Sequence, residues 1–223
     1  MHISRNVGGI GMSTPSNKKL TLLFFFAAAF AFVESSVVVY LRALYYPEGF
    51  YFPLTLIQRE HLVVELAREA ATIIMLVTAG MMAGDHKWEK FSYFIFAFGV
   101  WDIFYYVWLK IILNWPASIF DWDILFLIPL PWIGPVVVPL LISFFFIAAS
   151  ILIVMKEQGS FRPSPTAWIS AIVGSGLILY SFMQDTDATL LLAIPQPYLY
   201  GYFIAGFALY CFALFSSLRK RSQ

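Results

Sequence analysis

The stretch that decides the fold class is residues 60–83, which read EHLVVELAREAATIIMLVTAGMMA. It is long enough to cross a bilayer, which takes about 20 predominantly apolar residues. Its first half nevertheless carries His61, Glu65, Arg68 and Glu69. A charged side chain at bilayer depth costs roughly 2.5–3.5 kcal/mol on insertion scales, so such residues are rare and commonly functional. The stretch therefore predicts both a membrane span and a place to look for function.

The polar residues of this span share one helical face. His61, Glu65, Arg68, Glu69 and Thr72 are spaced so that they fall on a single stripe of an α-helix. The opposite face carries Val63, Leu66, Ile73 and Val77. We therefore expect a helix whose polar face is turned towards other helices and whose apolar face suits lipid or an apolar neighbour.

Apolar runs on both sides of this stretch extend the same architecture to the whole chain. The chain is 61% hydrophobic and 12% charged, whereas soluble domains have about 25% charged residues. The further runs cover residues 20–41, 91–113, 133–155, 167–183 and 199–218. The first is too long for a cleaved secretory signal, because it stays apolar as far as Tyr40. We expect an all-α integral membrane protein, with a single domain of about six transmembrane helices at 20–218 and short tails at 1–19 and 219–223.

The positions of basic residues predict the orientation of these helices. Cytoplasmic loops are enriched in Lys and Arg. Basic residues precede the first run, lie between the second and third and between the fourth and fifth, and end the chain; they are Arg5, Lys18, Lys19, Lys87, Lys90, Lys156, Arg162, Arg219, Lys220 and Arg221. The pattern predicts a multi-pass protein of the inner, or plasma, membrane with both termini cytoplasmic.

A Pro- and Trp-rich segment precedes the fourth run. Residues 115–139 contain Pro116, Pro129, Pro131, Pro135 and Pro139 in a strongly apolar setting. Proline removes a backbone donor and interrupts helices. We expect an interfacial or re-entrant passage here; the alternative is an apolar loop that lies on the lipid headgroups.

Two further acidic residues lie within apolar runs. Glu34 is in the first run and Asp102 is in the third. At about 1.5 Å rise per residue, both reach the same depth band as Glu65 and Glu69. Ala27–Ala31 and Gly99 offer small surfaces for close helix packing. We therefore expect the first three spans to pack together, with Arg42 and Arg68 as charge partners and with Arg68 as the direct partner of Asp102.

Two interpretations of these charges compete. In one, the arginines and carboxylates form a static network between helices. In the other, the excess of carboxylates binds or relays a cation, because Glu65 and Glu69 are like charges one turn apart. A proton would satisfy the excess, and so would a metal ion held by Glu34, His61, Glu65, Glu69 and Asp102. Carboxylate-rich sites between helices suit iron or manganese, but the His-x-x-x-Glu spacing departs from the usual pattern and Arg68 would repel a metal. We expect proton or cation binding, for transport or for membrane-embedded metal chemistry, and the sequence identifies no catalytic residue.

The aromatic residues support an alternative. They make up 19% of the chain, and Trp101, Tyr105 and Tyr106 flank Asp102. These three residues are candidates for binding a haem, quinone or carotenoid, as in a non-catalytic subunit of a larger membrane redox complex. The single cysteine, Cys211, allows no intrachain disulfide. No nucleic-acid motif is present, so the expected partners are the lipid bilayer, other membrane subunits or a second copy of the chain.

Overall fold

Long helices dominate the computed structural model, which describes residues 16–156 and 161–219. The order along the chain is α1 (Ser16–Tyr45), α2 (Arg59–Ala83), α3 (Lys87–Leu113), β1 (Trp122–Phe126), β2 (Trp132–Pro135), α4 (Val137–Val154), α5 (Pro165–Met183), α6 (Thr186–Leu190) and α7 (Tyr200–Leu218). Each of the six predicted runs contains a long helix, although the fourth run, 133–155, begins in β2 and its helix starts at Val137. Within the described residues, five helical segments are long and apolar enough to cross a membrane. The fold is therefore that of a multi-pass helical membrane protein.

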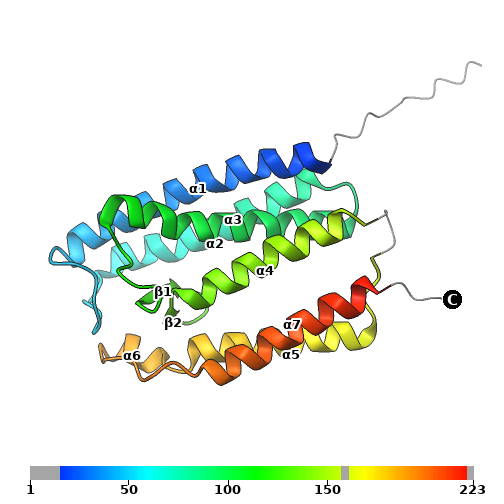
Figure 1. Ribbon diagram of the computed structural model, residues 1–223. Coiled ribbons are helices and arrows are strands. Elements are labelled where there is room, and N and C mark those ends of the chain that lie inside the picture. Colours follow the sequence, from blue (N-terminus) through cyan, green and yellow to red (C-terminus); the bar gives the residue numbers. More distant parts are fainter. Residues whose placement is uncertain (1–15, 157–160, 220–223) are drawn as a thin grey trace, which may run out of the picture.

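The charged helix α2 is not among those five segments. It is nevertheless 25 residues long and runs alongside α1 and α3 (Figure 1). Its polar residues lower its hydropathy without shortening it. As expected, Glu65, Glu69 and Thr72 of the polar stripe are buried, while His61 and Arg68 are partly buried and Val63 on the other side is 57% exposed.

The helices form two groups that are joined by α4. The helices α1 and α2 both pack on α3, α4 packs on the other side of α3, and α5 pairs with α7 (Figure 1). Ala27 and Ala31 are completely buried, as expected for small residues at helix contacts. Gly99 has a different role from the expected one: a Cβ there would lie 2.6 Å from the Ser143 carbonyl oxygen, so Gly99 admits α4 rather than α1 or α2.

The Pro- and Trp-rich segment corrects the all-α expectation. It forms a two-stranded antiparallel hairpin in which Trp122 pairs with Pro135 and Ile124 pairs with Ile133. The pairing is irregular between Ile124 and Phe126, and the connection holds Pro129 and Pro131. A strand tolerates proline only at its ends, edges or bulges. The two prolines therefore occupy the turn, while the apolar residues on either side pair as strands.

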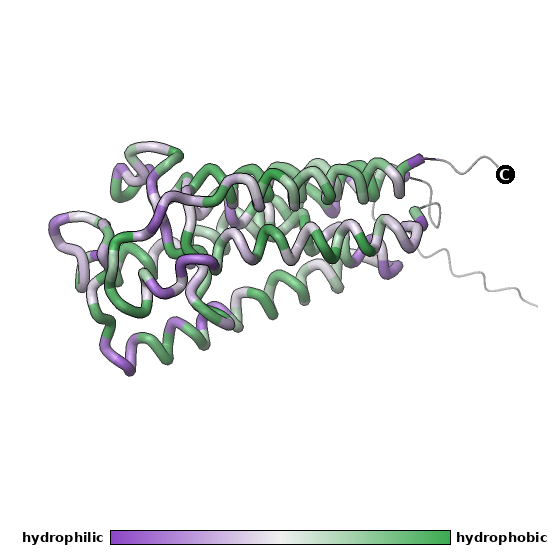
Figure 2. Tube along the Cα trace, turned by 90° about the horizontal axis from the view of Figure 1, so that it is seen from below, coloured by the Kyte–Doolittle hydropathy of each residue, from purple (hydrophilic) through white to green (hydrophobic). Residues whose placement is uncertain are grey.

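The hairpin lies at one end of the bundle, and both ends of the described chain lie at the other (Figure 1). An ion pair of 2.8 Å between Lys19 and Asp85 joins α1 to the α2–α3 loop at that second end. Figure 2 shows hydrophobic residues along the helices and more hydrophilic ones at the hairpin end. Exposed apolar side chains such as Leu22, Ile74 and Phe215 cover the outside, as suits contact with lipid.

Candidate functional site

A cavity of about 370 Å³ lies between the two groups of helices, and its wall includes the hairpin. Every helix except the short α6 contributes to the wall. Five carboxylates and two guanidinium groups line it: Glu34, Glu65, Glu69, Asp102, Asp123, Arg42 and Arg68. Most of the remaining wall is aromatic or aliphatic. The cavity thus collects nearly all of the charged residues that the sequence placed inside the spans.

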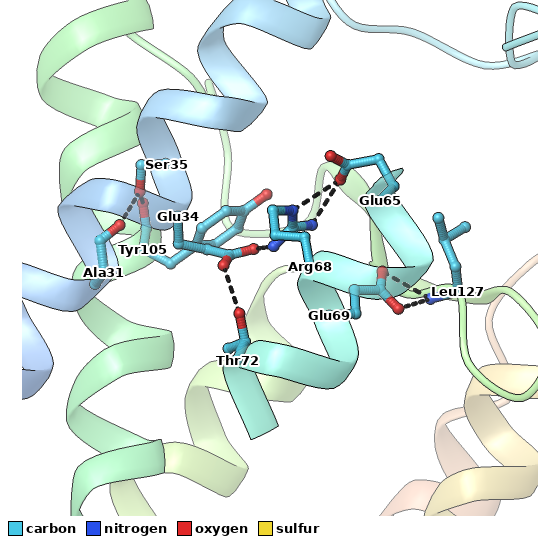
Figure 3. Close-up of polar contacts among 9 residues, drawn as sticks. All are labelled: Ala31, Glu34, Ser35, Glu65, Arg68, Glu69, Thr72, Tyr105 and Leu127. Atoms are coloured by element: carbon cyan, nitrogen blue, oxygen red, sulfur yellow. Dashed lines mark hydrogen bonds and ion pairs between the residues drawn. The ribbon is translucent and has the colours of Figure 1, made fainter. Parts of the chain in front are cut away.

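Arg68 is the centre of the first charge group, which Figure 3 shows in close-up. Its Nε and Nη2 donate to Glu65 Oε2 at 3.0 and 2.7 Å. Its Nη1 forms an ion pair with Glu34 of α1. The Thr72 hydroxyl donates to the other oxygen of Glu34 at 3.0 Å. One guanidinium therefore bridges two carboxylates from two helices, and the group carries a net negative charge when both carboxylates are ionised.

Glu69 faces a different partner. Its two carboxylate oxygens accept from the backbone N–H of Leu127 at 3.0 and 2.9 Å (Figure 3). Leu127 is the first residue after β1, so Glu69 holds the hairpin turn against α2. Glu65 and Glu69 lie one turn apart, as predicted, but they do not share one partner.

Arg42 forms a second charge group with Asp123, a residue of the Pro- and Trp-rich segment that was not among the site residues predicted from the sequence. Arg42 Nη2 donates to Asp123 Oδ1 at 3.0 Å, and both side chains are buried. The guanidinium carbon lies 4.3 Å from the ring centre of Phe50 and 3.7 Å from that of Trp115. The sequence does carry a signal for this pair: Asp123 is the second residue of the β-prone run WDILF, and a charge in an apolar strand requires a buried partner.

Asp102 corrects the expected pairing with Arg68. Its Oδ2 accepts a hydrogen bond of 2.7 Å from the Ser143 hydroxyl of α4. The physical reason is the position of Gly99, one turn earlier on α3. Because Gly99 has no side chain, α4 approaches closely enough for its Ser143 to reach Asp102. Asp102 and Arg68 still line the same cavity.

His61 lies apart from the cavity. Its Nδ1 is 2.6 Å from the Tyr45 hydroxyl at the end of α1, and it is not part of the cavity wall. Among residues 16–156 and 161–219, no group of three or more His, Cys, Asp or Glu side chains is arranged to hold a metal ion. The five predicted metal candidates therefore do not converge: Glu34 and Glu65 share Arg68, while His61, Glu69 and Asp102 each contact a different partner.

The three aromatic candidates all line the cavity. The rings of Trp101 and Tyr105 are stacked, with centres 6.4 Å apart and planes 27° apart. Tyr106 is buried beside them. The Ser35 hydroxyl donates to the Tyr105 carbonyl at 3.1 Å and so ties α1 to α3 at this level. Trp101 Nε1 is buried and has no hydrogen-bond partner among the described residues.

Comparisons with protein families, curated proteins and solved structures find no match to this chain. Its chemistry is therefore inferred from the side chains themselves. Two arginines neutralise Glu34, Glu65 and Asp123 in part, and within the described residues neither Glu69 nor Asp102 forms an ion pair. The cavity accordingly carries more carboxylates than fixed cations.

Proposed function

We propose that this membrane protein binds a cation in the cavity between its two helix groups and that binding serves transport. The first candidate for this cation is a proton. The observation that supports the proposal is the charge balance of the cavity wall, five carboxylates against two arginines. A buried carboxylate that stays ionised without a partner is strongly unfavourable in apolar surroundings, so it takes up a proton or another cation.

Asp102 is the side chain that best fits the proton-binding role. It is buried, and its hydrogen-bond partner among the described residues is the neutral hydroxyl of Ser143. Glu69 is the second candidate, because its contact is a neutral backbone N–H. We favour a proton over a metal ion, since the described acidic and histidine side chains do not converge as ligands.

Infrared difference titration of the protein in lipid nanodiscs tests this proposal. A protonated carboxyl has a C=O band that is lost on ionisation. We expect such a band in the wild type, its loss or marked reduction in Asp102→Asn, and its persistence in Asp85→Asn, which changes an exposed acid outside the cavity. A wild type without a titrating buried carboxyl band would contradict the proposal.

We also propose that the end of the bundle where the described chain begins and ends, near Ser16 and Arg219, faces the cytoplasm and that the hairpin lies at the outer interface of the inner membrane. The basic residues near Lys19 and Lys87 support this orientation. A membrane-impermeant maleimide, applied to cells that express single-cysteine variants in a Cys211→Ser background, should label Asp121→Cys and leave Lys87→Cys unlabelled. Labelling of Lys87→Cys from outside would reverse the topology.

The second candidate function is a cofactor-holding subunit of a membrane redox complex. The stacked rings of Trp101 and Tyr105 in the cavity wall favour it. An absorption spectrum and metal analysis of protein purified in mild detergent separate the candidates. A coloured protein would support cofactor binding, whereas a colourless one would favour cation binding.

A further inference from the structure

We propose that the cavity binds an organic cation with an apolar body, such as a lipophilic ammonium, phosphonium or guanidinium compound. This inference rests on the proposed cation-binding function and names the chemical class of the ligand. Three features of the cavity carry it: its volume, the division of its wall and the aromatic rings beside its carboxylates.

The volume suits a molecule rather than a bare ion. The cavity measures about 370 Å³, whereas one water occupies about 30 Å³ in the liquid. Pockets that bind small molecules span roughly 300–1,000 Å³ and are mostly apolar with a few polar groups. A proton or an inorganic ion alone would leave most of this space to be filled by water against apolar walls.

The wall is divided between a charged side and an apolar side. All of its charged residues come from α1, α2, α3 and β1. The helices α4, α5 and α7 contribute no charge; their contribution includes Ile142, Phe146, Ile178, Leu179, Phe182 and Tyr210. A ligand that fills the cavity therefore meets acidic groups at one end and hydrocarbon or aromatic surface at the other, which is the pattern that an amphiphilic cation requires.

Aromatic rings line the cavity together with Asp102, a carboxylate that forms no ion pair among the residues the structure describes. Trp101 and Tyr105 flank Asp102 in sequence and line the cavity with it. Aromatic faces attract organic cations, and rings around quaternary ammonium groups are a recurring means of recognition. The chain already binds its own Arg42 in this way, against the rings of Phe50 and Trp115 and the carboxylate of Asp123.

Trp101 offers the cavity wall a buried hydrogen-bond donor. It is 5% exposed, and its indole Nε1 has no hydrogen-bond partner among the described residues although it is buried. Buried donors in native proteins are nearly always paired. An acceptor atom on the ligand, such as an ether or carbonyl oxygen, would satisfy this donor.

The test uses the detergent-purified full chain and the probe tetraphenylphosphonium, with binding followed by calorimetry and tryptophan fluorescence. Tetraphenylborate has nearly the same shape and the opposite charge, so it reports non-specific apolar binding. We expect the wild type to bind the phosphonium and to discriminate against the borate.

Asp102→Asn should weaken phosphonium binding at least about tenfold, since losing one partner of a buried charge pair is costly, while Asp85→Asn should not change it. Mn²⁺ alone should not displace the probe.

Each result bears on the inference. Equal binding of the two probes, displacement by Mn²⁺, or unchanged affinity in Asp102→Asn would overturn it. If Asp102→Asn does not fold, Glu69→Gln takes its place, because glutamine keeps an acceptor for the Leu127 N–H while it removes the charge; an unchanged affinity there would likewise overturn the inference. A titrating carboxyl band without phosphonium binding would refute this inference and leave the proposed function standing. Phosphonium binding without that band would refute proton binding and support the organic-cation site.

Discussion

The α5–α7 pair and the α1–α3 group solve the same packing problem with different interactions. In α5–α7, a Cβ at Gly174 would lie 2.8 Å from the Gly206 carbonyl oxygen, and one at Gly206 would lie 2.7 Å from that of Gly174, so backbone contact holds the pair. In the α1–α3 group, towards the hairpin, an ion pair between Glu34 of α1 and Arg68 of α2 joins two helices, and Arg68 also binds Glu65 of its own helix. Both groups present apolar faces to the surroundings, so the difference lies entirely inside.

The α1–α3 group also contains an apolar interface of its own. Ala27, Ala31, Leu76, Tyr93 and Ala97 form a buried cluster, with exposed fractions of 0–1%. Replacing a buried ion pair with well-packed apolar residues is often neutral or stabilising. The apolar contacts are therefore enough for these helices to assemble without charges. This favours a function, rather than packing, as the reason for the charges beside the cavity.

The largest expected effect is that of Arg68→Met. Removing the guanidinium leaves Glu34 and Glu65 buried without their cation, which costs about 3–5 kcal/mol in comparable pairs. We expect a large fall in the thermal unfolding midpoint of the detergent-purified protein, followed by helical circular dichroism. Adding Glu34→Gln and Glu65→Gln to the same chain should restore much of the loss. A triple variant no more stable than Arg68→Met would show that Arg68 acts through packing rather than charge.

The helices of both groups can be predicted from the sequence, but the partners of their charged residues cannot. Apolar runs and the stripe of α2 are local patterns, so they predict the helices and the burial of Glu65 and Glu69 correctly. Partners are not local. The Asp102–Ser143 contact depends on how closely α4 approaches Gly99, and the Arg42–Asp123 pair depends on a hairpin that brings together residues 81 positions apart. The proline-rich segment reads as irregular because its strand pairing depends on register.

The second largest effect concerns the α5–α7 pair. Gly174→Ala places a methyl group against the Gly206 backbone, and overpacking of this kind costs about 1–3 kcal/mol. Gly176 is the matched control on the same helix, because nothing lies within 4 Å of an added Cβ there. Gly176→Ala should be neutral or slightly stabilising, since alanine favours a helix more than glycine does. Equal unfolding midpoints for the two variants would contradict the close backbone contact.

A smaller effect is expected for Glu65→Gln. Glutamine still offers an oxygen to the Arg68 donors, and the change removes the repulsion between Glu65 and Glu69. We expect a loss of about 1 kcal/mol or less, the scale of one hydrogen bond, in the unfolding assay used for Arg68→Met. If Glu65→Gln and Arg68→Met instead caused equal and small losses of stability, the result would support the interpretation of the charges as a static network between helices.

The smallest effect is expected for Asp85→Asn, at the end of the bundle opposite the hairpin. Lys19 donates to the Asp85 carboxylate and lowers its pKa, but the side chain of Asp85 is 59% exposed. Exposed ion pairs contribute little and are screened by salt. A lowered pKa means that the pair stabilises the fold above the ordinary aspartate pKa of about 3.9, and that this contribution disappears as the pH falls through the lower folded value. At pH 7 we therefore expect the unfolding midpoint of Asp85→Asn to lie close to that of the wild type, and the remaining difference to vanish in high salt. A fall in unfolding midpoint as large as that of Arg68→Met would mean that this exposed pair holds α1 to the α2–α3 loop. Buried and exposed ion pairs would then contribute equally to stability, contrary to the comparison made above.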